Sequence, residues 1–167
     1  CGASGVLPAT MLYLQRRDGL SDEQIWRALA TGGIVGNVVK TNASVSGAEA
    51  GCQAEIGTAT AMAAAAVCSL AAHSLEITEY AAEIALEHQL GLTCDPVGGY
   101  VQIPCIERNA VAAMRAIDSA DLASVLSGTR KISFDLVVRT MYETGRDLNE
   151  RYRETSGGGL ASGYKVC

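Results

Sequence analysis

Cysteines are the residues of this chain with the clearest chemical potential, and they occur at positions 1, 52, 68, 94, 105 and 167. Three of them lie in polar, glycine-containing stretches: Cys52 in SGAEAGCQAEIG, and Cys94 and Cys105 in GLTCDPVGGYVQIPCIERN. The spacings are too wide for a Cys-x-x-Cys redox pair or for the close pairs of a structural zinc site. Three thiolates from three loops suit an iron–sulfur cluster that keeps one iron free of protein ligands. Spacing alone leaves open that they are unrelated core or surface thiols.

The elements that must position these cysteines are predicted to be helices, because no segment shows strand alternation. Apolar spacing marks a helix over 7–17, and Ser21 with Gln24 forms a capping-box pattern before the next one. In that second helix Gly32 and Gly33 predict a break or a close helix contact, whereas 40–52 has no clear period. Further helices are predicted over 53–72, 78–90, 106–125 and 133–149, the last capped by Ser133.

The predicted fold class is therefore all-α, a helical bundle with a central small-residue helix and cysteine-bearing loops. The segment 53–72 is nearly continuous Ala, Met, Val and Thr, so we expect several neighbours to approach it closely. The chain of 167 residues suits a single domain, 1–167, with a flexible glycine-rich tail over 157–167. It opens at Cys1 inside CGASGVLP without a Met, so we interpret it as a fragment of a longer protein.

Composition narrows the class of partner. Hydrophobic residues make up 49% and charged residues 19%, which predicts a folded, close-packed protein. The net charge is -5 with scattered Lys and Arg, so we expect neither nucleic acid nor a membrane surface as a partner. No apolar run is long enough to span a bilayer.

A family resemblance is carried by GLTCDPVGGYVQIPCIERNA together with KTNASVSGAEAGCQAEIG. These stretches resemble the signature of the iron–sulfur-dependent L-serine dehydratases (L-serine ammonia-lyases). The resemblance extends over the whole chain, through GASGVLPA, the MAAAA helix, AAEIALEHQLGL and TMYETGRDLNERYRETSGGGLA. One departure is Thr60, which stands where many relatives carry a further cysteine, so position 60 is not expected to be a ligand.

The resemblance implies an all-α catalytic domain in which Cys52, Cys94 and Cys105 bind a [4Fe-4S] cluster. It implies that the open iron acts as a Lewis acid on the hydroxyl of L-serine, giving pyruvate and ammonia without pyridoxal phosphate. It also implies an N-terminal regulatory domain and further catalytic residues before Cys1, and we expect the general base among them. The isolated fragment is then expected to be inactive.

Substrate contacts are predicted in the two most polar stretches, because a carboxylate needs cations or N–H donors. The candidates are Lys40, Asn42, Ser44, Ser46, Arg108 and Asn109; the alternative for each is a role in loop or helix capping. Glu55, one turn after Cys52, could orient a ligand or form a salt bridge, and both interpretations stay open. Cys68 lies mid-helix among Ala and Val and is expected to pack in the core; Cys1 is assigned no role.

Cys167 offers a free α-carboxylate and a soft heteroatom on its β-carbon, which is the pattern of serine itself with sulfur in place of oxygen. Our hypothesis is that the tail folds back and Cys167 is a removable fourth ligand of the iron, displaced by substrate. The resemblance favours this role, since relatives can end similarly. The alternative is a mobile terminal thiol.

The functional prediction is thus the cluster-binding part of a cytoplasmic L-serine ammonia-lyase. Its expected partners are L-serine, the absent regulatory domain and, because small-residue helices pack closely, a second copy in a homodimer. Two alternatives remain: a helical interaction or sensing module with a structural cluster, and a zinc-stabilised binding domain.

Overall fold

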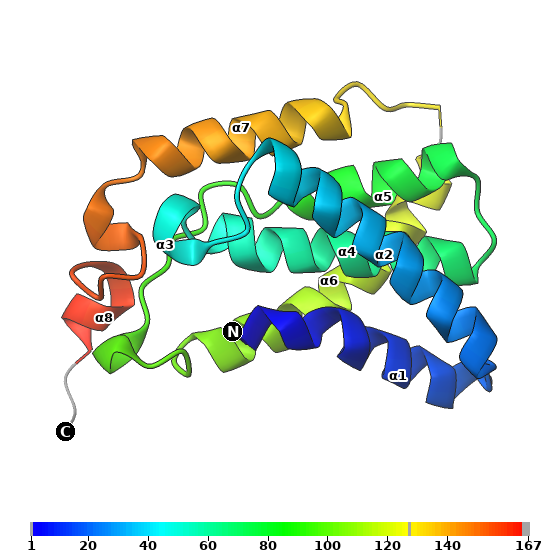
Figure 1. Ribbon diagram of the computed structural model, residues 1–167, viewed down its shortest axis with the longest axis horizontal. Helices are drawn as coiled ribbons and strands as arrows, with labels where there is room; N and C mark the ends of the chain where they lie inside the picture. The colour runs from blue at the N-terminus through cyan, green and yellow to red at the C-terminus, as the bar shows by residue number, and fades with distance from the viewer. Residues whose placement is uncertain (1, 127, 165–167) are drawn as a thin grey trace.

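The computed structural model describes residues 2–126 and 128–164 as a bundle of α-helices (Figure 1). The long helices are α1 (Val6–Asp18), α2 (Asp22–Asn42), α4 (Thr58–Leu70), α5 (Leu75–Glu87), α6 (Cys105–Val125) and α7 (Phe134–Asp147). Shorter elements are η1 (Gly2–Gly5), α3 (Gly47–Ala50), the π-helix η2 (Gln53–Gly57), η3 (Val97–Gly99), η4 (Glu150–Tyr152) and α8 (Gly159–Gly163). The one β-type pairing among the described residues is an isolated bridge between Cys94 and Arg153. The predicted all-α class is confirmed.

Helix α4 is the centre of the bundle and contacts α1, α2, α5 and α6 (Figure 1). Its alanines at 61, 63, 64, 65 and 66 are fully buried. Alanine has almost no side chain to separate two backbones, so α2 approaches very closely. A Cβ added at Gly32 would lie 2.9 Å from the backbone oxygen of Met62. Helix α2 continues through both glycines without a break, and of the two only Gly32 marks a close contact.

Serine side chains set the starts of three helices. Ser21 Oγ accepts from the N–H of Gln24 and Gln24 Oε1 accepts from the N–H of Ser21, which confirms the predicted capping box. Ser133 Oγ accepts from the N–H of Leu136 at the start of α7. Ser74 Oγ accepts from the N–H of Ile77, so α5 begins at Leu75, ahead of the predicted position 78.

The segment before α4 differs from prediction in two ways. Residues 40–52 contain the end of α2 and the short helix α3, where no regular structure was expected. The predicted helix over 53–72 begins as a π-helix, η2, and continues as α4 only from Thr58. Single π-turns of this kind are frequent at functional sites.

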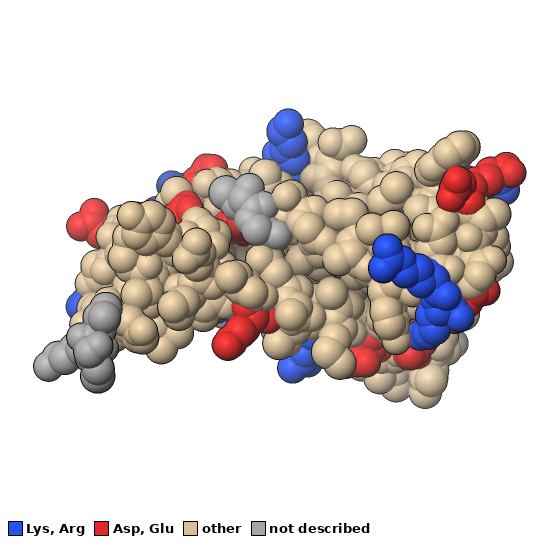
Figure 2. Space-filling view, turned by 90° about the horizontal axis from the view of Figure 1, so that it is seen from below, with Lys and Arg blue, Asp and Glu red and all other residues tan. Residues whose placement is uncertain are grey.

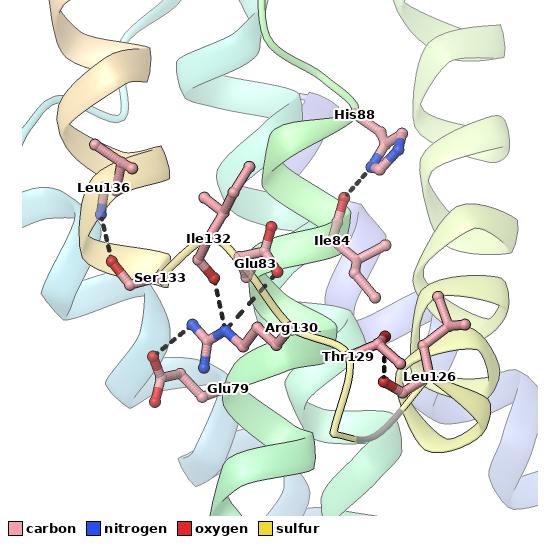
Figure 3. Close-up of polar contacts among 10 residues, drawn as sticks. All are labelled: Glu79, Glu83, Ile84, His88, Leu126, Thr129, Arg130, Ile132, Ser133 and Leu136. Carbon is pink, nitrogen blue, oxygen red and sulfur yellow. Dashed lines mark hydrogen bonds and ion pairs between the residues drawn. The ribbon is translucent and has the colours of Figure 1, made fainter.

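Arg130 fastens the loop between α6 and α7 onto α5, as Figure 3 shows. Its Nη2 donates to Glu79 Oε1 at 2.8 Å, and its Nε donates to the carbonyl oxygen of Ile132 at 2.7 Å. The guanidinium also lies 5.8 Å from the ring centroid of Tyr80 and 4.0 Å from Glu83 Oε2. Glu83 is 1% exposed, so Arg130 supplies the positive charge nearest to a buried carboxyl group.

The C-terminal segment packs against the loop that carries Cys94, at the end of the molecule where α3 and α8 lie (Figure 1). The N–H of Cys94 donates to the carbonyl of Tyr152, and the N–H of Glu154 donates to the carbonyl of Cys94, each at 2.8 Å. The N–H of Leu160 donates to Asp95 Oδ2 at 2.7 Å. The predicted tail 157–167 therefore contains a short helix, α8, docked through Asp95, while Cys167 lies outside the described residues.

Surface charge is dispersed on the face drawn in Figure 2, where basic and acidic side chains stand in separate groups around a largely uncharged centre. Over residues 2–126 and 128–164, no helix combines the length and the hydropathy that a membrane crossing requires.

Candidate metal centre and adjoining cavity

Three of the predicted ligands are buried at the α3–α8 end of the bundle. Cys52, Cys94 and Cys105 are 3%, 3% and 4% exposed and none forms a disulfide. Cys52 immediately precedes η2, Cys94 lies in the loop after α5, and Cys105 is the first residue of α6. Two of the three thiols therefore lie at the N-terminal end of a helix, where unpaired N–H groups favour a thiolate. Cys1 and Cys167 lie outside the described residues.

Cys52 and Cys94 are in direct contact. The Cys94 thiol donates to Cys52 and holds the pKa of Cys52 below its usual value, and the positive charge of Arg108 acts in the same direction. The same hydrogen bond, with burial, raises the pKa of Cys94. Burial also raises the pKa of Cys105, and the charge of Cys52 raises it further, so all three sulfur atoms lie within electrostatic range of one another.

The carboxylate of Glu55 completes the immediate surroundings of two thiols. Cys52 Sγ, Cys94 Sγ and a Glu55 oxygen lie within 4.8 Å of one another, a group that does not include Cys105. Glu55 is positioned by the π-turn η2, one turn after Cys52. Burial raises the pKa of Glu55, and the nearby charge of Glu154 raises it further.

Gly47 lies between the Cys94 thiol and a cavity of about 700 Å³. A Cβ added at Gly47 would lie 3.0 Å from Cys94 Sγ and 3.1 Å from Glu55 Oε2. Gly47 and Glu55 both line the cavity, whose charged or polar lining residues include Lys40, Ser46, Thr58 and Glu154. Because residue 47 has no side chain, only its backbone lies between the Cys94 thiol and a space large enough for a small substrate.

Arg108 and Asp95 hold two of the cysteine segments together. Arg108 donates from Nη1 to the carbonyl of Thr93 at 2.9 Å and from Nη2 to Asp95 Oδ1 at 3.0 Å. Asp95 is buried, and its second oxygen accepts from the N–H of Leu160. Because Arg108 is one turn into α6, the pair connects the helix of Cys105 to the loop of Cys94 and to the C-terminal segment.

The predicted substrate residues occupy different places. Lys40 and Ser46 line the cavity. Asn42 Nδ2 donates to the carbonyl of Val38, and Ser44 Oγ donates to Glu49 Oε2, so both serve local structure in these contacts. Asn109 lies on α6 away from the cavity lining, and its buried Oδ1 has no hydrogen-bond partner. The structure therefore brings Lys40 and Ser46 to the cavity, and does not bring Asn42, Ser44, Arg108 or Asn109 into its lining.

Three further residues of this region carried little or no signal in the sequence. Thr58 looks like one of many small residues of the central helix, and only its place two turns after Cys52 could have marked it. Asp95 follows Cys94 directly, but its partners lie far along the chain. Glu154 has a left-handed backbone, φ 63°, fixed by its hydrogen bond to Cys94, and no local pattern predicts that conformation.

The donor set fits a group that takes soft sulfur ligands. Three buried thiols converge from three segments, the pKa of one of them is lowered by its neighbours, and glycine at 47 leaves space beside Cys94. A single ion could be reached by Cys52, Glu55 and Cys94, whereas including Cys105 requires a larger group. A cluster of several irons is such a group.

Comparison with known proteins shows which family the chain resembles over its whole length. The family model described as "Serine dehydratase alpha chain" matches residues 1–161. The chain is 51% identical over 161 residues to the L-serine dehydratase TdcG of Escherichia coli, covering 96% of this chain and 36% of that protein. It is 48% identical over 167 residues to an L-serine dehydratase of Streptomyces coelicolor, covering 99% of this chain and 37% of that protein. An L-serine dehydratase of Helicobacter pylori is 51% identical over 166 residues, which cover 98% of this chain and 36% of that protein. The chain thus spans little more than a third of the length of these curated relatives.

Proposed function

Because this chain belongs to the serine dehydratase alpha chain family, we propose that it forms the cluster-binding part of an enzyme that converts L-serine to pyruvate and ammonia. The observation that carries the proposal is the position of the buried Cys94 thiol directly behind Gly47, which lines the cavity. A substrate in the cavity would have its reacting carbon next to any group held by those thiols. The relatives' names supply the substrate, and the residues around the cavity suit a small zwitterion.

Cys52, Cys94 and Cys105 would hold a [4Fe-4S] cluster, and Cys167 is our proposed removable fourth ligand. When bound, such a cluster supplies a Lewis acid for the hydroxyl group that leaves. The chain's own residues position the ligands: α6 presents Cys105, η2 presents Cys52, and Arg108 with Asp95 fixes the loop of Cys94. Arg108 acts in this proposal as a positioning residue, because its Nη1 and Nη2 already donate hydrogen bonds to Thr93 and Asp95.

Substrate binding falls to the cavity. Lys40 is the cation of the lining and would attract the substrate carboxylate, with Ser46 beside it as a hydrogen-bond donor. We propose that the general base lies outside this chain. We also propose that the whole protein has a regulatory domain and forms a homodimer.

The test is anaerobic reconstitution of the full-length protein with iron and sulfide, followed by a serine-to-pyruvate assay. Broad visible absorption with turnover is expected. Absorption without turnover would favour a structural or sensing cluster in a helical module, and zinc binding with neither would favour a zinc-stabilised domain. A full-length protein without its Cys167 is expected to change its cluster spectrum and its affinity for serine; unchanged values would refute the fourth-ligand role.

A further inference from the structure

We infer that Glu55, assisted by Thr58, binds the α-ammonium group of the substrate and so makes the cavity selective for amino acids over hydroxy acids. This assignment rests on the proposed function and concerns residues that the cysteines and Lys40 leave unexplained. It names the side of the cavity on which the positive end of the zwitterion lies.

The first observation is an uncompensated negative charge. Glu55 and Glu154 both line the cavity, and the charge of Glu154 acts on Glu55. Neither carboxylate forms an ion pair with a Lys or Arg in the part of the chain that the structure describes. Glu55 is also half-buried and has a hydrogen bond to the backbone of Ala3, but no Lys or Arg side chain offsets the hydration that it gives up. A ligand ammonium would relieve both the burial and the repulsion.

The second observation is an unpartnered hydroxyl in the same lining. Thr58 is 4% exposed and lines the cavity, and its Oγ1 has no hydrogen-bond partner. Other buried threonines on the helices bond back to the carbonyl four residues earlier: Thr10 to Val6 at 2.8 Å and Thr60 to Ile56 at 2.6 Å. Thr58 directly follows the π-turn η2 and makes no such bond. Its oxygen is buried, so a rotation of the side chain about χ1 is needed to turn the hydroxyl toward a donor in the cavity.

The third observation is the order of groups along the cavity wall. A Glu55 oxygen lies within 4.8 Å of Cys52 Sγ and Cys94 Sγ. In serine the ammonium is on the carbon next to the one that bears the hydroxyl. The carboxylate is on that same carbon, so if the hydroxyl faces the thiol-bound group, charge decides which of the two lies beside Glu55, and the ammonium is the group that a carboxylate attracts. The carboxylate then extends toward Lys40, which carries the opposite charge.

The experiment compares two ligands in the full-length, anaerobically reconstituted protein. L-serine and 3-hydroxypropionate share the carboxylate, the carbon chain and the hydroxyl, and differ in the ammonium. For wild type, Glu55→Gln and Glu55→Asp, the apparent affinity for L-serine is taken as KM where it turns over and as the calorimetric dissociation constant where it does not, and that for 3-hydroxypropionate as its inhibition or dissociation constant. Wild type is expected to prefer L-serine by at least about tenfold, the strength of one charge-assisted hydrogen bond. Glu55→Gln should bring the ratio close to one by weakening serine alone, and Glu55→Asp should restore part of the preference.

A matched control is Glu107→Gln, which removes the same charge near Cys105 from an exposed residue outside the cavity lining. It should keep the wild-type ratio. Thr58→Val, nearly equal in shape, should lower the ratio a few-fold and provides a second test if Glu55→Gln folds poorly by circular dichroism.

The outcomes separate this inference from the proposed function. Turnover of serine by wild type with an unchanged ratio in Glu55→Gln and Thr58→Val overturns the ammonium site alone. Serine binding without turnover in wild type refutes the proposed reaction, while a collapsed ratio in Glu55→Gln still supports the site. Absence of any preference for serine in wild type overturns the inference.

Discussion

Arg108 donates a hydrogen bond from Nη2 to Asp95 Oδ1 at 3.0 Å, across two segments that each carry a cysteine. Asp95 follows Cys94 directly and Arg108 follows Cys105 by one turn. The distance between two of the proposed ligands is therefore set by a buried ion pair as well as by the backbone. The pair lies apart from the cavity lining, so its effects on ligand geometry can be tested separately from substrate contacts.

Arg108→Ala is expected to lower cluster occupancy and to destabilise the fold by about 3–5 kcal/mol, because the buried carboxylate of Asp95 loses its charged partner. Iron content and urea unfolding of the full-length protein measure both effects. The control is Arg27→Ala, which breaks an exposed pair with Glu23 and should cost less than about 1 kcal/mol. Equal effects of the two substitutions would contradict the positioning role of Arg108.

Alanine at Cys52, Cys94 or Cys105 is expected to remove most of the bound iron, because a cluster is held by thiolates. Cys68→Ala is the matched control. Cys68 is also fully buried, but it lies mid-helix and burial raises its pKa to about 11, so its thiol stays protonated at neutral pH. Iron and sulfide analysis after anaerobic reconstitution gives the measurement. Retention of full iron by any of the first three variants would remove that residue from the ligand set.

Gly32→Ala and Gly33→Ala are expected to have opposite effects on stability. A Cβ at Gly32 would lie 2.9 Å from Met62 O and 3.1 Å from Leu7 Cδ2, so overpacking should cost about 1–3 kcal/mol. At Gly33 a Cβ meets nothing within 4 Å, and replacing glycine within a helix should stabilise by about 0.5–1 kcal/mol. Denaturant midpoints distinguish the two, and a shift in the same direction for both would argue against the close approach of α2 and α4.

Stability is expected to fall as pH rises from about 5 to 7 because of Glu83. Burial raises the pKa of Glu83 to about 7, with Glu87 and Glu79 adding to the shift and Arg130 opposing it. In this window the folded protein holds a proton that the unfolded chain has released, so unfolding becomes easier by up to about 3 kcal/mol. The unfolding free energy of wild type minus that of Glu83→Gln, measured between pH 5 and 8, isolates this contribution. A difference that rises with pH, or stays flat, would be inconsistent with a protonated Glu83.

Helix starts could be predicted from sequence because the signal is local. Ser21 with Gln24, and Ser133, carry their partners within three residues, so each cap is visible in a short window. Ser74 has the same kind of partner, Ile77, but the helix was predicted to start only at 78. The Ala-rich segment also showed its central place, because residues that are small on every side suit a helix with neighbours all around it.

The surroundings of the cysteines were less predictable because their contacts are long-range. Cys52, Cys94 and Cys105 could be grouped from loop position and from resemblance. The partners of Cys94 are Tyr152 and Glu154, whose backbone groups carry no sequence signal. Arg108 was assigned to substrate by its charge and its place in a polar stretch, since nothing in the sequence shows that Asp95 and Thr93 occupy its nitrogens.

The pairing of Cys94 with Tyr152 and Glu154 has a consequence for biogenesis. A ribosome makes the chain from its N-terminus, so Cys52, Cys94 and Cys105 emerge well before the segment that fixes the backbone of Cys94 on both sides. Until that segment has been synthesised and has docked, the three thiols belong to a partly formed pocket. Delivery of iron and sulfide before that segment is made would therefore meet an incomplete site, and maturation should follow its synthesis and docking.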